Sequence, residues 1–284
     1  MCLAAWALAP HPRLALVLAA NRDEFHERPS LPLAPWALPS GGTAYAGRDE
    51  RAGGTWLGLS ASGRLALLTN VRRTTTVAPQ APSRGQLPTA WLDSHEPAPT
   101  FWPRWATQGH APFNLLMADL AHAQWHWGSN VGGLKDGPVL AALPPEARRW
   151  GLSNAALDTP WPKLVALKTA LGDALARHAN APEAPNLPAL CDALWHALAD
   201  RTRAPDADLP DTGFGLARER MLSSIFIDDE RGVYGTRCAT VVLVERLPNG
   251  GLRPQVHERR FAPGGAVLGT TVLTLPVFSP ATLR

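Results

Sequence analysis

Cysteine and long apolar runs are scarce in this chain. Three of its 284 residues are cysteines: Cys2, Cys191 and Cys238. A small, odd number of cysteines excludes a disulfide scaffold. Their spacing is not that of a zinc site, so we expect no bound metal. Few cysteines suit a reducing compartment, which predicts a cytoplasmic protein. No apolar run approaches the roughly 20 residues of a membrane-spanning helix, so we expect no membrane span.

An excess of charge of one sign is also missing. Lys and Arg total 27 against 24 Asp and Glu, which gives a formal net charge of +3. The basic residues are scattered in pairs such as Arg72-Arg73 and Arg259-Arg260, whereas nucleic-acid binding requires a basic stripe or patch. We therefore expect no nucleic-acid partner. With 45% hydrophobic and 18% charged residues, the chain is typical of folded proteins.

No internal repeat and no long linker divides the chain, so we expect one domain over residues 1–284. Apolar runs predict strands at 3–9, 14–20, 53–60, 64–70, 114–119, 124–127, 224–227, 236–244 and 255–261. Leucine spacing predicts helices from 163 and from 187, a further helix is expected within 83–93, and the proline-rich segment 29–39 is interpreted as a loop. The continuous apolar strands indicate sheets covered on both faces, which favours an α+β fold with helices outside packed sheets.

The strongest candidate for chemistry is the cysteine that directly follows the initiator methionine. Methionine before a small residue is a normal substrate for co-translational removal, and loss of Met1 gives Cys2 both a thiol and a free α-amine. The reference pKa values of about 8.5 for the thiol and about 7.7–8.0 for the amine allow the amine to accept the thiol proton. The alternative is that cysteine stands second by chance.

A polar cluster, Asn21-Arg22-Asp23-Glu24, follows the second apolar run. If the first two strands form a hairpin, this cluster approaches the start of the chain. An arginine near a thiol stabilises the thiolate, and an aspartate can orient an ammonium by accepting its hydrogen bond. The alternative interpretation is an ordinary charged turn at the end of a strand.

Three further polar residues stand at predicted strand ends: Asn70, Asn154 and Arg237. A side-chain amide can donate to a developing oxyanion, and an arginine at the start of a strand can order such a site. Each also has a structural alternative, because asparagine favours turns and arginine pairs with surface carboxylates.

These residues carry a resemblance to a known family. The motifs that carry it are Met1-Cys2, Asn21-Arg22-Asp23-Glu24-Phe25, Gly53-Gly-Thr-Trp-Leu-Gly58, Leu68-Thr-Asn70, Arg84-Gly85, Gly151-Leu-Ser-Asn154, Thr159-Pro-Trp161 and Tyr234-Gly-Thr-Arg237. Together they resemble the NRDE family, also described as transport and Golgi organisation two-like, over residues 1 to about 244. The resemblance implies a four-layer αββα sandwich of the N-terminal-nucleophile hydrolase type.

More distantly, the spacing resembles the choloylglycine hydrolase and penicillin V acylase group. That resemblance implies Cys2 as the nucleophile, Asn70 and Asn154 near the oxyanion, and Arg22, Asp23 and Arg237 as the remaining catalytic candidates. The pattern departs at the second strand, because Arg22 and Asp23 are adjacent where those enzymes separate arginine and aspartate by two residues. Neighbours on a strand point to opposite faces, so we expect only one of the two to face the thiol.

Two functional hypotheses follow. In the first, processed Cys2 cleaves a linear amide or a thioester of a small-molecule acyl substrate, without a cofactor. In the second, which the family resemblance implies, the same fold carries haem, acyl-coenzyme A or a lipid as a non-catalytic trafficking protein.

Overall fold

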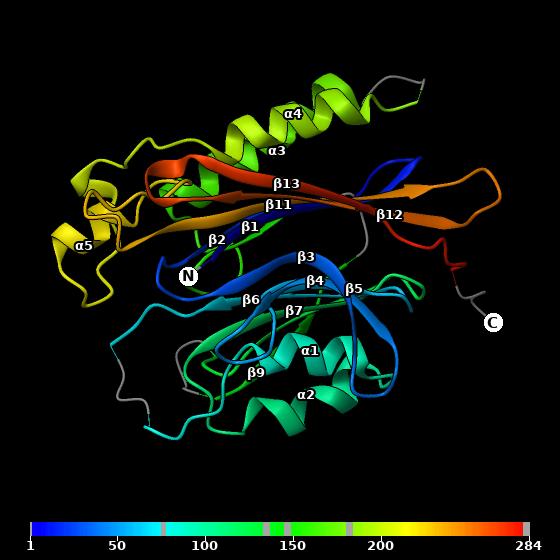
Figure 1. Ribbon diagram of the computed structural model, residues 1–284, viewed down its shortest axis with the longest axis horizontal. Coiled ribbons are helices and arrows are strands. Elements are labelled where there is room, and N and C mark those ends of the chain that lie inside the picture. Colours follow the sequence, from blue (N-terminus) through cyan, green and yellow to red (C-terminus); the bar gives the residue numbers. More distant parts are fainter. Residues whose placement is uncertain (1, 75–77, 133–136, 145–148, 180–183, 281–284) are drawn as a thin grey trace.

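The computed structural model describes residues 2–74, 78–132, 137–144, 149–179 and 184–280 of the chain. Two antiparallel sheets lie face to face, and helices cover the outer face of each sheet (Figure 1). The stack therefore has four layers in the order helix, sheet, sheet, helix. This confirms the α+β class and the αββα sandwich that the sequence predicts.

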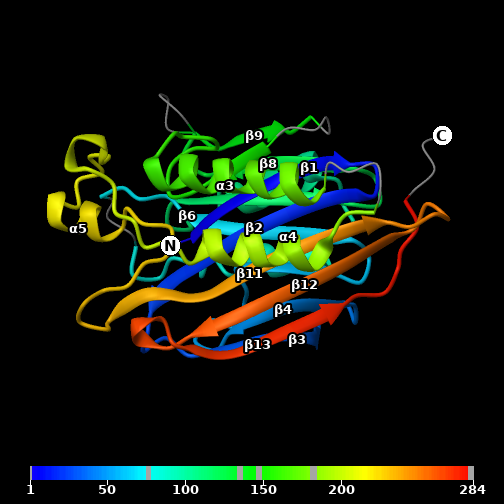
Figure 2. The same cartoon turned by 90° about the horizontal axis from the view of Figure 1, so that it is seen from above.

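Sheet A contains the start of the chain. Its strand order is β10 (Arg149–Leu152), β1 (Cys2–His11), β2 (Leu14–Phe25), β11 (Tyr234–Arg246), β12 (Leu252–Phe261) and β13 (Val267–Thr274). The hairpin of β1 and β2 thus lies inside the sheet, with β10 and β11 on its two sides. Figure 2 shows β1, β2, β11, β12 and β13 side by side from above.

Sheet B is a run of neighbouring antiparallel strands in chain order. It comprises β3 (Ser30–Ala37), β4 (Thr43–Asp49), β5 (Leu57–Ser60), β6 (Arg64–Asn70), β7 (Phe113–Asp119), β8 (Gln124–Ser129) and β9 (Val139–Ala142). The predicted hairpins at 53–70 and 114–127 are confirmed here as β5–β6 and β7–β8.

Two helices cover each sheet, and a shorter one stands at the end of the sandwich. α1 (Gln86–Asp93) and α2 (Ala98–Ala106) pack on sheet B, α3 (Pro162–His178) and α4 (Leu187–Leu198) pack on sheet A, and α5 (Leu216–Met221) lies near the start of β1 (Figures 1 and 2). Asn186 caps α4, because its side chain accepts a hydrogen bond from the Ala189 N–H at 3.2 Å.

Sheet A is apolar on both faces. Along β1, Ala4, Trp6 and Leu8 pack against sheet B, whereas Leu3 and Ala5 pack against the helices α3 and α4. Alternation places successive side chains on opposite faces, so a continuous apolar run gives a strand buried on both sides. Within the described residues, no helix is long and apolar enough to cross a membrane.

Two local predictions are wrong. Residues 30–37 form β3 rather than a loop: Pro32 and Pro35 are tolerated because β3 is the edge strand of sheet B and its register shifts between Leu31 and Ala34. Residues 224–227 are not a strand. Isolated contacts hold this segment instead: Ser224 Oγ donates to the Phe226 carbonyl at 2.6 Å, and the Phe226 N–H donates to the Asp200 carbonyl at 2.7 Å.

Candidate functional site

Strand register places Cys2 beside Arg22. Cys2 pairs with Arg22 across β1–β2, and Arg22 pairs in turn with Cys238 across β2–β11. Residues opposite each other in a ladder share a face, and this row continues the face of Ala4 and Trp6, which meets sheet B. Of the two adjacent charged residues, Arg22 is therefore the one that shares the side of the thiol.

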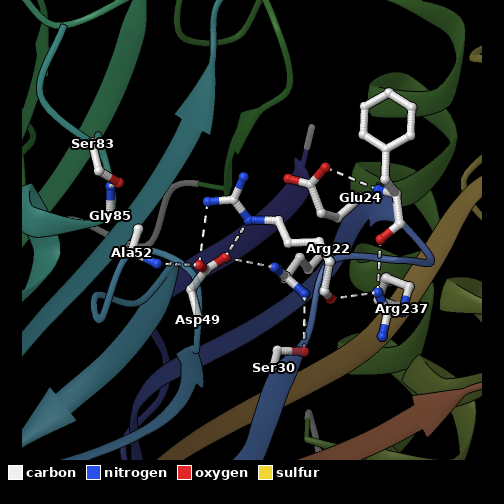
Figure 3. Close-up of polar contacts among 10 residues, drawn as sticks. Arg22, Glu24, Ser30, Asp49, Ala52, Ser83, Gly85 and Arg237 are labelled. Atoms are coloured by element: carbon white, nitrogen blue, oxygen red, sulfur yellow. Dashed lines mark hydrogen bonds and ion pairs between the residues drawn. The ribbon is translucent and has the colours of Figure 1, made fainter. Parts of the chain in front are cut away.

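The Arg22 side chain is buried and fully engaged. Its guanidinium donates to Asp49 Oδ2 at 3.2 Å and to Ser30 Oγ at 3.3 Å (Figure 3). Its Cζ lies 4.1 Å from the ring centroid of Trp56. An arginine held in this way is a fixed positive charge next to the thiol.

Asp49 is the hub of this network. Arg28 Nε donates to Asp49 Oδ2 at 2.5 Å, and the Ala52 N–H donates to Oδ1 at 2.9 Å. Burial opposes ionisation, but these hydrogen bonds and the charges of Arg28 and Arg22 together hold the pKa of Asp49 below its usual value. Asp49 therefore stays a carboxylate and fixes two arginines in place.

Arg237 lies at an irregularity in the ladder, because the β2–β11 register shifts between Thr236 and Cys238. Its Nη1 donates to the backbone carbonyls of Phe25 at 2.8 Å and Arg28 at 3.0 Å, as Figure 3 shows. Arg237 thus fixes the turn that carries Arg28. The described contacts connect it with the Arg22 network and not directly with the Cys2 thiol.

Asp23 points to the other side of sheet A, toward the helices. It is buried, and its Oδ1 accepts a hydrogen bond from Thr236 Oγ1 at 2.8 Å. Burial raises the pKa of Asp23, and the charge of Lys163 is the largest opposing influence. Leu3 pairs with Asn21, and Cys2 pairs with Arg22, so the next residue of β2 along the ladder is Asp23. The backbone nitrogen of Cys2 therefore lies at the Asp23 end of the ladder. Met1, whose removal the sequence predicts, lies outside the described residues.

The two asparagines are brought together. Asn154 Nδ2 donates to the backbone carbonyl of Asn70 at 2.9 Å, and Asn154 is fully buried. Leu152 pairs with Ala4 on β1, so Asn154 lies two residues further along, in the direction of Cys2. Asn70 ends β6 on the facing sheet. The sandwich therefore gathers Cys2, Arg22, Asp23, Asn70 and Asn154 at one end.

Cys2 is partly exposed as a residue, but its thiol is buried. Burial raises its pKa, and the neighbouring Arg22 charge lowers it while Asp23 acts in the opposite sense. Cys2 lines a small void of about 10 Å³ together with Trp56 and Thr240. The thiol can therefore become a nucleophile only with help from a nearby base.

A much larger cavity, of about 1470 Å³, opens at the same end of the sandwich. Asn70, Glu24, Arg84 and Tyr234 are among its lining residues. Nine arginines line it against four acidic residues, so the cavity is strongly cationic. Cys2 is not among the lining residues, but Arg84, which lines the cavity, lies within electrostatic reach of the thiol.

An ion pair closes one wall of the cavity. Arg72 Nη1, just beyond β6, donates to Glu219 Oε2 on α5 at 2.5 Å, and the two side chains are 1% and 3% exposed. Thr212 Oγ1 also donates to Glu219 Oε1, and the Arg72 guanidinium lies 4.8 Å from the ring centroid of Trp161. These contacts fasten α5 to the site.

Several of these residues escaped prediction. The sequence pattern indicates Lys163 only as the beginning of a helix, and no local motif marks Asp49, Arg28 or Glu219. The signal that could have found Lys163 is its rarity: the chain has three lysines, and this one stands at the first turn of an apolar helix. Within the described residues, no group of three or more His, Cys, Asp and Glu side chains could hold a metal ion.

Comparison with known proteins gives a consistent family. The model of the family described as Transport and Golgi organisation 2 matches residues 1–263. The Transport and Golgi organization 2 homolog of Mus musculus is 31% identical over 257 residues, which is 86% of this chain and 89% of the mouse protein. The Homo sapiens homolog is 32% identical over 260 residues, with the same 86% and 89%.

Two solved structures are similar at low sequence identity. Penicillin V acylase from Agrobacterium tumefaciens has a TM-score of 0.46 and 9% identity, covering 86% of this chain and 83% of its own. A mutant conjugated bile acid hydrolase from Clostridium perfringens has a TM-score of 0.42 and 5% identity, covering 99% of both chains.

Proposed function

The chain belongs to the Transport and Golgi organisation 2 family, and from that premise we propose that it is a cysteine N-terminal-nucleophile hydrolase of the cytoplasm. Its reaction is the cleavage of a linear amide or a thioester by Cys2 after Met1 has been removed. One observation carries the proposal: because the ladder pairs Cys2 with Arg22, the Cys2 nitrogen lies at the end of the ladder where the buried Asp23 follows.

The proposed chemistry needs no cofactor. The freed α-amine of Cys2 accepts the thiol proton, and the thiolate attacks the acyl carbon to form a carbon–sulfur bond. The tetrahedral oxyanion then collapses, the amine or thiol leaving group departs with the proton, and a thioester to Cys2 remains. Water attacks that thioester, which releases a carboxylic acid and restores the thiol.

Each candidate residue has a role that follows from its place. Arg22, fixed by Asp49, supplies positive charge beside the thiolate. Asn154 and Asn70 lie together on the side toward Cys2, and they supply amide donors for the oxyanion. Arg237 acts indirectly, because it holds the turn that carries Arg28.

The test combines the N-terminal mass of the purified chain with labelling by an aryl thioester that carries an alkyne-tagged acyl chain. We expect a mass without Met1 and acyl transfer to Cys2. Cys2→Ala abolishes the labelling, whereas the matched control Cys191→Ala, at a buried position on α4, retains it. Retention of Met1, or equal labelling of Cys2→Ala, would overturn the proposal.

The second candidate function is non-catalytic transport of haem, acyl-coenzyme A or a lipid on the same fold. The observation in its favour is the arginine-lined cavity, which suits the carboxylates of haem or the phosphates of coenzyme A. Titration of the wild type and of Cys2→Ala with haem separates the cases. A Soret change in both proteins supports a haem carrier, and no change in the wild type excludes haem as the cargo.

A further inference from the structure

Lys163 is an ammonium group buried behind the candidate site. It is the second residue of α3, its side chain is 4% exposed, and its Nζ makes no hydrogen bond within the described residues. A buried cation without hydrogen bonds is costly unless an opposite charge compensates it, and packing alone is served better by leucine or methionine. The position therefore indicates a role for the charge.

The first turn of α3 is held close to sheet A. A Cβ added to Gly151 of β10 would lie 2.6 Å from Leu164 Cδ1, so the glycine is what allows this approach. Asp158 Oδ1 accepts hydrogen bonds from the Gly151 N–H and from Lys168 Nζ, both at 2.7 Å, which ties the loop before α3 to the helix. Lys163 is thereby brought down onto the helix-facing side of the sheet, where Asp23 points.

The charged groups that act on Lys163 come from four elements. Asp23 of β2 has the largest effect, followed by Arg72 after β6, Cys2 of β1 and Glu219 of α5. Arg72 and Glu219 are bound to each other at 2.5 Å, so their charges largely cancel. Asp23 and Lys163 remain as opposite charges behind Cys2, with Tyr234 and Thr236 as further neighbours of the carboxylate.

We propose that Lys163 is a positioning residue of the Cys2 site: its ammonium keeps Asp23 ionised, and the Asp23 carboxylate then accepts a hydrogen bond from the Cys2 amine that Met1 removal exposes. The inference rests on the proposed function. The inference extends the proposed function by adding a residue on the helix-facing side of sheet A. This residue touches neither the thiol nor the substrate.

The consequence for proton transfer is direct. When the amine takes the thiol proton it becomes an ammonium, and an ionised Asp23 stabilises that ammonium. Without Lys163, the burial that raises the pKa of Asp23 loses its largest opposing influence, so the carboxylate is disfavoured and the thiolate–ammonium pair is less well supported. Burial also lowers the pKa of Lys163 to about 8, so the wild type itself loses this support at alkaline pH.

The test is the second-order rate constant for alkylation of Cys2 by iodoacetamide between pH 5 and 10, on protein whose N-terminal mass has been determined. We expect Lys163→Met to move the midpoint of the profile upward by about one pH unit, which is about a tenfold lower rate at pH 7. Lys163→Arg, which keeps the charge, restores the profile. Arg177→Met, which removes an exposed cation from the last turn of the same helix, leaves it unchanged.

Two further variants make the outcome decisive. If Lys163→Met does not fold, as judged by circular dichroism, Lys163→Gln replaces it, because it can hydrogen-bond but carries no charge. In the Asp23→Asn background, Lys163→Met is expected to leave the profile unmoved, since its effect passes through Asp23. If Lys163→Met shifts the midpoint equally in the wild-type and Asp23→Asn backgrounds, Lys163 does not act through Asp23, and the proposal is overturned.

Failure of this inference is distinguishable from failure of the proposed function. A mass that retains Met1 removes the premise, and both proposals fall. A chain without Met1, labelled at Cys2, whose profile is the same in the wild type and in folded Lys163→Met, overturns only the role of Lys163.

Discussion

Cys2 and Arg22 face each other across the β1–β2 ladder, with both side chains on the face of sheet A that meets sheet B. Asp23, one residue further, points to the helices instead, where it accepts a hydrogen bond from Thr236 and the charge of Lys163 lowers its pKa. The adjacent arginine and aspartate are therefore divided between the two faces. Arg22 can act on the sulfur, whereas Asp23 lies toward the backbone nitrogen of the same cysteine.

The three cysteines are expected to differ sharply in reactivity. Burial raises the pKa of all three thiols, that of Cys191 to about 11 and that of Cys238 well above its usual value, but Cys191 and Cys238 are buried residues whereas Cys2 is partly exposed. At pH 8, native protein should be alkylated at Cys2 first. Peptide mass mapping of timed reactions checks this, with denatured protein as the control in which all three react. Modification of Cys191 or Cys238 as fast as Cys2 would contradict the burial described here.

Asp49→Asn is expected to destabilise the protein by about 3 kcal/mol, because it leaves the buried charge of Arg22 without its partner. Urea denaturation at pH 7 measures this loss. Asp206→Asn, which breaks an exposed pair with Arg220, is the control and should leave the urea midpoint unchanged.

The same variant has a defined pH dependence. The pKa of Asp49 is lower in the folded chain than in the unfolded one, so its stabilisation is complete above the unfolded value of about 3.9 and is lost as the pH falls through the folded value. The difference in unfolding free energy between the wild type and Asp49→Asn should therefore narrow below about pH 4. A constant difference down to pH 2 would contradict this assignment.

Gly151→Ala is expected to cost about 1–3 kcal/mol, because the new methyl group overlaps Leu164 and forces α3 away from sheet A. Gly137→Ala is the matched control, since a Cβ at that position meets no atom of the described residues within 4 Å. Thermal unfolding followed by circular dichroism compares the two variants. Equal melting temperatures would show that α3 can shift without cost.

Local patterns were sufficient for the elements whose apolar residues are regularly spaced. The leucines of α3 and α4, and the cap at Asn186, define those helices without tertiary information. The β3 strand was missed because prolines normally exclude strands, and only its edge position removes the conflict. β13 was missed because its exposed side chains, such as Leu268, give no buried face to detect.

The residues of the candidate site likewise divide into those that a local sequence pattern predicts and those that only tertiary packing brings in. Cys2, Arg22 and Asn154 could be predicted because they stand at strand ends in a recognisable order. Lys163 and Glu219 are brought in by helix packing, and Glu219 is 147 residues from its partner Arg72. No short-range pattern reports such a pairing. Which face of sheet A the Arg22 and Asp23 side chains point to also depends on strand register, and only the assembled sheet determines that register.

The buried pair of Arg72 and Glu219 gives the last prediction. Glu219→Leu leaves the Arg72 charge buried and uncompensated, which should cost about 3–5 kcal/mol in urea denaturation. The double variant Arg72→Met, Glu219→Leu should recover most of that loss, because apolar side chains of similar volume replace the pair.

Trypsin supplies a local measurement, since α5 carries Arg218 and Arg220. Cleavage there should accelerate in Glu219→Leu, because the helix is released from the cavity wall, and return toward the wild-type rate in the double variant. A double variant as unstable as the sum of the single ones would show that Trp161 and Thr212, rather than the ion pair, hold α5 in place.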